Sequence, residues 1–403
     1  AVTLRLTGDC EFDAVTVSSG DTLDLNGQRA EFGGTFDIDD GGIVESAGSL
    51  IYANATGSGY AVDSDGSWTT ARGLGTTDLV VTGSSVNLDL PGGNNPFRTI
   101  MINSAGTVNK YYEASADGNV IIGAGTYDSS SQNSFPTDFT IATGGTFTAG
   151  GTTSTVAGDF TTSGGLIGKS ALDFDGVDDL VNCGHNSSLA NLFDSGGTVE
   201  AWIKPDSDGE GNDGRIADKG KWIFNVEAES GSTMKLRLYQ YFDGMDASFS
   251  TTDRVITKDK WNHVALTYDN SSPSNLPKIY VDGKQVALTN ALSTTGTRDT
   301  DADDDFIIGN SAAASKTFDG HIAMVRAFSD IRTEAEIRTD MFNAFANMSS
   351  THLLEGMWQF DEGTGSTVDN VETEEANDGT IYGAAWAGAG TFTYGTSTLK
   401  MTG

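Results

Sequence analysis

The chain has 403 residues, of which 37% are apolar and 51 are Gly, with only six Pro. This is enough material for two or three domains with buried cores, and a chain rich in Gly, Ser and Thr favours short strands joined by tight turns. The net charge of −33 argues against nucleic-acid partners, and no apolar run of about 18 residues exists that could insert into a membrane.

Residues 1–165 consist of short segments in which apolar and polar residues alternate. This pattern is typical of strands with one buried face, and Gly, Asn or Asp bounds each segment as a turn signal. The clearest segments are 15–17, 23–25, 35–38, 79–81, 86–90 and 139–141. Their close spacing predicts a β-solenoid-like scaffold domain, with a β-sandwich as the alternative. Strand-like sequence begins directly at Ala1, and no signal peptide is visible there.

The amino-acid composition changes near Gly164, beyond which bulkier aromatic residues, Lys and Arg become frequent. We therefore predict a second domain over 166–390. Within it, Thr333-Glu-Ala-Glu336 has the form of a capping box and is followed by apolar residues at helical spacing. This pattern predicts one short helix near 333–346 in an otherwise all-β protein.

The last segment, 391–403, repeats a pattern of the first domain, because Thr391-Phe-Thr echoes Thr146-Phe-Thr. One interpretation is that the chain leaves the first domain, builds the second and then returns, since domains whose ends are close together tolerate insertion. The other interpretation is that 391–403 opens a further module.

Five blocks of the second domain follow one another in a characteristic order. The first is Ala171-Leu-Asp-Phe-Asp-Gly-Val-Asp-Asp-Leu-Val181, and the others are 198–205, 261–284, 307–310 and 318–326. They resemble the blocks of the laminin-G-like domains of bacterial and phage surface proteins, which have the concanavalin A-like lectin/glucanase fold. The resemblance implies a jelly roll of two packed sheets, and the alternating strands of these blocks agree with it.

One block departs from the family's order. Trp358-Gln-Phe-Asp-Glu-Gly363, with Trp386 beyond it, precedes the opening block in relatives but follows it here. Either the domain is circularly permuted, with this segment supplying its edge strands, or a second repeat begins here. We favour permutation, because a jelly roll without those strands would expose a sheet edge.

The fold family includes glucanases, which need two carboxylates that flank the scissile bond. Such enzymes carry an alternating Glu-x-Asp-x-Glu-like motif, and the nearest segment here, Glu227-Ala-Glu229, lacks the central Asp. No nucleophile elbow or zinc-protease motif appears, and four His with two distant Cys serve transition metals poorly. We therefore predict a non-catalytic protein, with a glycoside hydrolase as the least favoured alternative.

Calcium is the one cofactor that the sequence suggests, because carboxylates in flexible loops are its preferred ligands. The candidate ligands lie in two acidic segments and are Asp206, Asp208, Asp299, Asp301 and Asp303. The second segment lacks the Gly and Glu of a calcium-binding helix-loop-helix, and solvated acidic loops are the alternative for both. We interpret a third acidic group, within 175–179, as a turn that holds the fold.

The family resemblance implies glycan binding by loops at one rim of the sandwich, with acids, amides and exposed aromatic residues. The segment 238–244 matches this description best. Tyr239 and Tyr241 could stack on a pyranose, while Gln240 and Asp243 could accept hydrogen bonds from its hydroxyls. The alternative is a plain strand with both tyrosines on one face.

The leading hypothesis is an adhesive protein, located outside the cell or on a cell or virion surface, whose β-scaffold displays a lectin-like jelly roll to glycans. The alternative is a structural phage protein, such as a capsid decoration, fibre or filament subunit, that associates with itself or with other virion proteins. Cys10 and Cys183 leave open one long-range disulfide or, as we favour, two free thiols.

Overall fold

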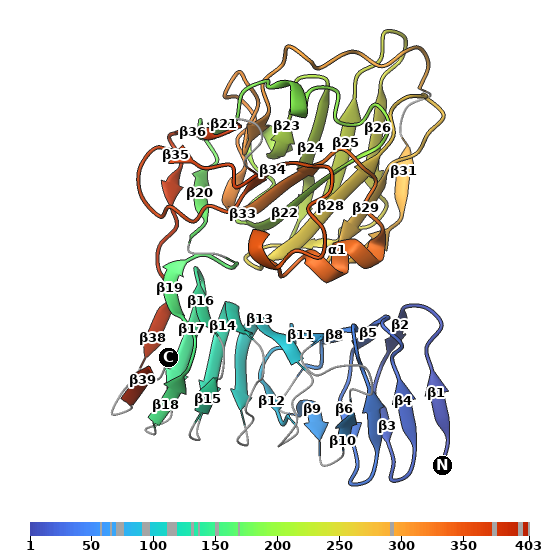
Figure 1. The fold of residues 1–403 in the computed structure, drawn as a ribbon, viewed down its shortest axis with the longest axis vertical. Helices are drawn as coiled ribbons and strands as arrows, with labels where there is room; N and C mark the ends of the chain where they lie inside the picture. Colours follow the sequence, from blue (N-terminus) through green and yellow to red (C-terminus); the bar gives the residue numbers. More distant parts are fainter. Residues whose placement is uncertain are drawn as a thin grey trace. The chain divides into compact units, whose positions relative to one another are not determined.

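A computed structural model describes residues 1–56, 59–64, 67–69, 76–90, 97–110, 119–129, 133–135, 138–149, 153–167, 170–290, 294–372, 377–393 and 398–401. The chain divides into two compact units (Figure 1): unit 1 comprises Ala1–Leu166 and Gly388–Gly403, and unit 2 comprises Ile167–Ala387. Strands dominate both units, which confirms the predicted all-β class. No helix in the described ranges has the length and apolar character needed to cross a membrane.

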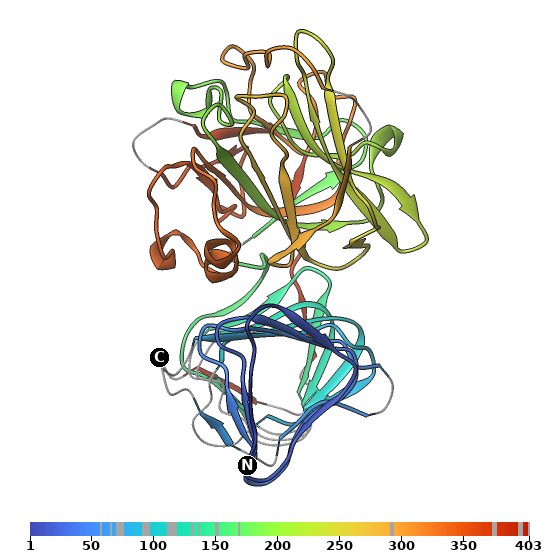
Figure 2. The same ribbon diagram turned by 90° about the vertical axis from the view of Figure 1, so that its right-hand side faces the viewer.

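Unit 1 is a β-solenoid, the first of the two predicted architectures, and Figure 2 shows its coil nearly end-on. One face carries β1 (Thr3–Arg5), β4 (Thr22–Asp24), β7 (Ile43–Glu45) and β10 (Ser67–Thr69). The next faces begin with β2 (Cys10–Phe12), β5 (Arg29–Phe32), β8 (Leu50–Ala53) and β11 (Thr77–Val81), and with β3 (Val15–Val17), β6 (Phe36–Ile38), β9 (Tyr60–Ser64) and β12 (Val86–Leu88). Strands of successive turns pair in parallel.

The later turns of unit 1 continue these faces. They contain β13 (Phe97–Lys110), β14 (Asn119–Ser129), β15 (Asn133–Phe135), β16 (Phe139–Ala142), β17 (Gly145–Ala149), β18 (Thr153–Val156) and β19 (Phe160–Gly164). The long strands β13 and β14 join two faces into one sheet, because their two halves pair with different strands.

The core of unit 1 is a column of inward-facing apolar side chains, since alternate residues of each strand point inward. Phe139 stacks on Phe160 of the next turn with 5.8 Å between ring centroids. The turns differ in length: Ala30 pairs with Ile51, but Ile51 pairs with Leu79, seven residues further than the first step. This variation explains why the sequence shows no strict period.

Unit 2 is inserted between neighbouring strands of one solenoid turn. After β19 the chain builds unit 2 and then forms β38 (Thr391–Thr393), which pairs with β17, and β39 (Thr398–Met401), which pairs with β18. The backbone N–H of Gly390 donates to the carbonyl of Thr162 at 3.0 Å, and the rings of Phe160 and Phe392 lie 5.7 Å apart. The two ends of the insertion therefore meet.

Unit 2 consists of two antiparallel sheets. Sheet I contains, in spatial order, β30 (Lys284–Val286), β29 (Lys278–Val281), β28 (Asn262–Tyr268), β22 (Gly197–Pro205), β33 (Asp319–Phe328), β20 (Leu172–Asp175) and β37 (Ala385–Trp386), with β34 (Leu354–Trp358) beside β33. Sheet II contains β31 (Leu288–Asn290), β26 (Ala247–Thr251), β25 (Thr233–Gln240), β24 (Trp222–Ser230), β23 (Arg215–Asp218), β32 (Ile307–Ile308), β21 (Leu180–Asn182), β36 (Gly379–Tyr382) and β35 (Thr367–Val368), with β27 (Ile256–Thr257) beside β25. Short 3₁₀ turns are η1 (Ser187–Leu189), η2 (Glu210–Asn212) and η3 (Phe345–Asn347).

The late Trp block belongs to this jelly roll. The strand β34 pairs with β33, β36 pairs with β21, and β37 pairs with β20. The segment therefore covers strands that would otherwise be edges, as the permuted arrangement requires.

The helix α1 (Glu334–Asp340) begins at the predicted capping box, in which Thr333 and Glu336 bond each other's backbone N–H. It ends six residues earlier than predicted. Asp340 is buried and accepts hydrogen bonds from Arg332, Asn343 and the Ser349 N–H, which fix the chain beyond it in a turn. Both cysteines, Cys10 and Cys183, are free thiols.

Candidate functional site

The second acidic loop, predicted as a calcium site, encloses a cation of the protein itself. Lys219 at the end of β23 is fully buried, and its Nζ donates to the carbonyl oxygens of Asp301 and Asp304 at 3.2 and 2.6 Å. The buried Asp301 carboxylate lies 4.0 Å from the same Nζ. Asp303 is exposed and Asp299 is half-buried. The ammonium group thus occupies the place where carbonyl and carboxylate oxygens converge.

The first acidic segment is likewise satisfied internally. Asp208 is buried, and its carboxylate accepts the backbone N–H of Glu229 at 2.8 Å, while its own N–H donates to the Glu229 carboxylate. Asp213 pairs with Arg237 at 2.6 Å. Asp206 is half-buried, and burial raises the pKa of its carboxyl group. These contacts fold the loop, and calcium binding by Asp206 and Asp208 stays a prediction.

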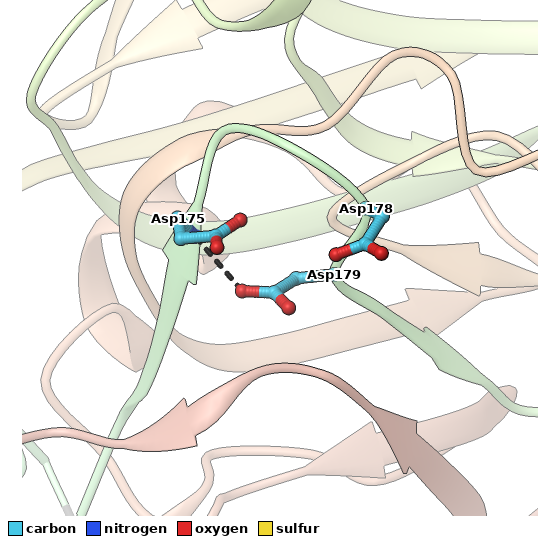
Figure 3. A group of neighbouring side chains, drawn as sticks. All are labelled: Asp175, Asp178 and Asp179. Atoms are coloured by element: carbon cyan, nitrogen blue, oxygen red, sulfur yellow. Dashed lines mark hydrogen bonds between the residues drawn. The ribbon is translucent and has the colours of Figure 1, made fainter.

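A different acidic group could hold a metal ion. Figure 3 shows Asp175 at the end of β20, with Asp178 and Asp179 in the turn that leads to β21. The ligand oxygens of these three residues lie within 4.8 Å of one another. These residues form the one such group of three among the residues that the structure describes. Burial, together with the carboxylates of Asp175 and Asp178, raises the pKa of Asp179.

The same turn also has the structural role that the sequence suggests. The Asp179 carboxylate accepts the N–H of Asp175 at 2.8 Å, and the Asp175 carboxylate accepts the N–H of Val177 at 2.9 Å. One oxygen of each of these two carboxylates is therefore engaged by backbone. The oxygens that remain suit a hard cation such as Ca²⁺, which also accepts water and carbonyl ligands.

The nearest counterpart of a glucanase motif does not present two free carboxylates. Glu227 accepts a hydrogen bond from Ser250 at 2.6 Å and pairs with Arg237 at 3.0 Å. Glu229 pairs with Lys258 at 3.2 Å. The intervening Ala228 has a positive φ of 56°, and the strand register shifts after Glu227, so simple alternation does not place the two side chains together.

The predicted tyrosines lie side by side on the solvent face of sheet II. Tyr239 and Tyr241 are both half-buried, and their ring centroids are 5.0 Å apart at an interplanar angle of 63°. The Tyr239 hydroxyl donates to the Asp246 carboxylate at 2.8 Å, and burial together with this carboxylate raises the pKa of Tyr239 to about 12. Ser248 lies opposite Tyr239 on β26.

Arg237 adds a flat polar group to this surface. Its Cζ lies 5.9 Å from the centroid of the Tyr239 ring. Asp213, Glu227 and the Asn225 side-chain oxygen bind three different nitrogens of the guanidinium at 2.6, 3.0 and 3.2 Å. We call Tyr239, Tyr241, Arg237, Asp246 and Ser248 the tyrosine platform. It combines aromatic rings with fixed planar hydrogen-bonding groups, which is the chemistry that recognises a sugar ring.

Two predicted glycan-binding residues behave differently from the tyrosines. Gln240 is fully buried; its amide donates to the carbonyls of Lys221 and Tyr241 and accepts from Asn270, so its prediction as a ligand-binding residue is corrected. Leu238 and Gln240 alternate with Tyr239, and the strand period turns them inward. Asp243 is exposed, and its carboxylate accepts the N–H of Thr297 at 2.7 Å.

Sequence reasoning missed Arg237, Asp246 and Lys219. Arg237 could have been found from the alternation of β25, because it lies two residues before Tyr239 and shares its face. No local signal marks Lys219, whose partner loop begins about 80 residues later.

Residues 175–338 match the sequence model of a family described as the concanavalin A-like lectin/glucanases superfamily. Unit 2 contains a domain of this superfamily. The lectin-like domain therefore has the fold that the five sequence blocks predicted. Among curated proteins, no match to the chain was found.

Three solved structures illustrate what the chain is similar to. A candidate carbohydrate-binding protein from Bacteroides ovatus is 20% identical to this chain with a TM-score of 0.40, and the alignment covers 54% of this chain and 59% of that protein. A pentraxin from Limulus polyphemus has 14% identity and a TM-score of 0.32, covering 42% and 79%. Tailspike protein 2 of an Escherichia coli O157:H7 bacteriophage has 10% identity and a TM-score of 0.32, covering 87% and 59%. The chain thus spans 59% of the length of the first and third proteins.

Proposed function

We propose that the protein is a non-catalytic glycan-binding protein of a cell or virion surface, in which unit 1 is a scaffold and the lectin-like domain binds the glycan. The tyrosine platform carries this proposal. It places two half-buried tyrosine rings beside a guanidinium that three acceptors hold in place. Such a surface is pre-organised, so a bound sugar ring does not have to order it.

The carboxylates around the platform support binding in preference to hydrolysis. Hydrolysis requires one carboxyl group as an acid and a second as a base or nucleophile, both free to reach the scissile bond. Glu227 and Asp213 are ion-paired with Arg237, and Asp246 accepts the Tyr239 hydroxyl. These groups act as fixed hydrogen-bond acceptors.

Calcium, as we propose it, belongs to the β20–β21 turn and not to the glycan site. The group Asp175, Asp178 and Asp179 lies where the chain passes from β20 to β21, and four strand steps separate β21 from β25 in sheet II. Neighbouring strands lie about 4.8 Å apart, so the two places are roughly 19 Å apart across the sheet. Calcium here would stabilise the turn by reducing the repulsion among three carboxylates.

A glycan array tests the proposal, with the purified chain applied in calcium and again in chelator. We expect binding to a defined class of sugars in both conditions, and loss of that binding in Tyr239→Ala. Tyr382→Ala is the matched control, because Tyr382 is 54% exposed on β36, well away from the platform. No binding in either condition would instead favour the structural alternative, a subunit that associates with copies of itself or with other surface proteins.

A further inference from the structure

The arginines of the tyrosine platform and its neighbouring strand are already paired within the protein. Two nitrogens of Arg237 are paired with Asp213 and Glu227, and the third donates to an amide oxygen. Arg215, the neighbouring arginine on β23, pairs with the buried Asp218. Both guanidinium groups are therefore neutralised by carboxylates of the protein.

The surroundings of the platform are rich in hydrogen-bond acceptors. Carboxylates that border the platform or pair with its cations are Asp213, Asp218, Glu227, Asp243 and Asp246. The cations are Arg215, Arg237, Lys221, whose carbonyl accepts the Tyr241 N–H, Lys235, which lies opposite Glu227, and Lys316, whose Nζ lies 3.8 Å from the Asp213 carboxylate. These charges balance locally, whereas the net charge of the whole chain is −33. Acceptors of this kind bind hydroxyl groups and repel anions.

We infer that the tyrosine platform binds an uncharged, hydroxyl-rich sugar ring and discriminates against sugars that carry a carboxylate or sulfate. This inference rests on the proposed function and names its ligand class. The rings of Tyr239 and Tyr241 offer the apolar contact, and Asp246 with the carboxylates that border the platform accepts hydrogen bonds from sugar hydroxyls.

An acidic sugar that bound Arg237 would have to displace a carboxylate of the protein. The side chains of Asp213 and Glu227 are only 18% and 16% exposed. A ligand carboxylate that approached Arg237 would leave one of them partly buried without its partner, which is unfavourable. The platform thus discriminates against acidic sugars because Arg237 is paired with these carboxylates before any ligand binds.

Matched oligosaccharides test this inference on the 403-residue chain. Each pair consists of a neutral oligosaccharide and the same oligosaccharide with one added sialic or uronic acid, and affinity is measured in low and in physiological salt. We expect the neutral member to bind at least about tenfold more tightly in low salt. Screening shortens the range of the repulsion to about 8 Å at physiological ionic strength, so we expect the difference to shrink there.

Two variants test the cause. Asp213→Asn and Glu227→Gln each remove one carboxylate from Arg237 and keep a side chain of the same shape, so each should improve binding of the acidic member relative to wild type. Tryptophan fluorescence verifies folding, and either variant suffices if the other does not fold. Equal or tighter binding of the acidic member by the wild type, weakened by salt, would overturn the inference while leaving glycan binding intact. If neither member binds, or if Tyr239→Ala binds as well as wild type, the proposed function itself fails.

Discussion

Replacing Lys219 by Met removes the cation around which the second acidic loop folds. The side chain is fully buried, its Nζ serves two carbonyl oxygens, and the Asp301 carboxylate 4.0 Å away is 2% exposed. Removing one partner of a buried ion pair costs about 3–5 kcal/mol, because the remaining charge stays buried. For a domain the size of unit 2 this lowers the unfolding temperature by roughly 6 to 20 °C.

The assay is chemical unfolding followed by tryptophan fluorescence. Five of the six Trp residues lie in unit 2, so the signal reports mainly on this unit. Lys235→Met is the matched control, because Lys235 is a half-exposed lysine of the same sheet whose Nζ donates to a single carbonyl. We expect this variant to unfold within about 1 kcal/mol of wild type.

The pH dependence of the Lys219→Met defect has a defined sign. Burial already raises the pKa of Asp301, and loss of the ammonium group raises it further. A raised folded-state pKa makes the carboxylate a penalty at high pH that is relieved as the pH falls through that pKa. The defect should therefore be smaller at about pH 5 than at about pH 8. A loss below about 1 kcal/mol, or recovery of stability on adding Ca²⁺, would refute the assignment of this loop to Lys219.

Three further predictions concern the fold. Gly309→Ala should destabilise unit 2 by about 1–3 kcal/mol or more, because the φ of Gly309 is +82° and an added Cβ would lie 2.0 Å from the Phe174 ring. Gly231→Ala is the control in the same urea titration, because Gly231 also has a positive φ but has open space around it. Equal effects of the two substitutions would contradict this reasoning. Burial lowers the pKa of His321 to about 4, so between pH 6.5 and 4 this side chain is protonated in the unfolded chain but largely neutral in the folded one. The free energy of unfolding should therefore fall by up to about 3 kcal/mol over this pH range. In His321→Gln that part of the pH profile should flatten, and an unchanged profile would exclude His321 as its source. Replacing 167–387 by a short Gly-Ser linker should leave a folded solenoid, because the ends of the insertion already meet. The readouts are a retained β-sheet signal in circular dichroism and a cooperative thermal transition. An unfolded product would show that the folding of unit 1 depends on unit 2.

Local features of the fold were predictable, because they depend on neighbouring residues. The capping box of Thr333 and Glu336 fixes the start of α1 by contacts three residues apart. The alternation of β25 likewise places Tyr239 and Tyr241 on one face. The same alternation should have excluded Gln240, which lies between them and therefore points into the domain.

Long-range ion pairing was not predictable from the same signals. A run of acids has the same appearance whether it binds calcium or a lysine from a distant strand, and Lys219 reaches Asp301 across 82 residues. The pairing of Asp213 with Arg237 spans 24 residues and converts a predicted calcium loop into part of the platform's support. Such contacts depend on tertiary packing, which the spacing of residues in the sequence does not predict.

The affinity of the best array glycan for three proteins tests whether the tyrosine platform is the glycan-binding site. Wild type, Tyr239→Ala and Tyr382→Ala are titrated with that glycan, and thermal melting confirms that all three are folded. We expect at least about a tenfold loss of affinity for Tyr239→Ala, equivalent to about 1.4 kcal/mol, and no change for Tyr382→Ala. Unchanged affinity in Tyr239→Ala, or an equal loss in Tyr382→Ala, would contradict the claim that the tyrosine platform is the glycan-binding site.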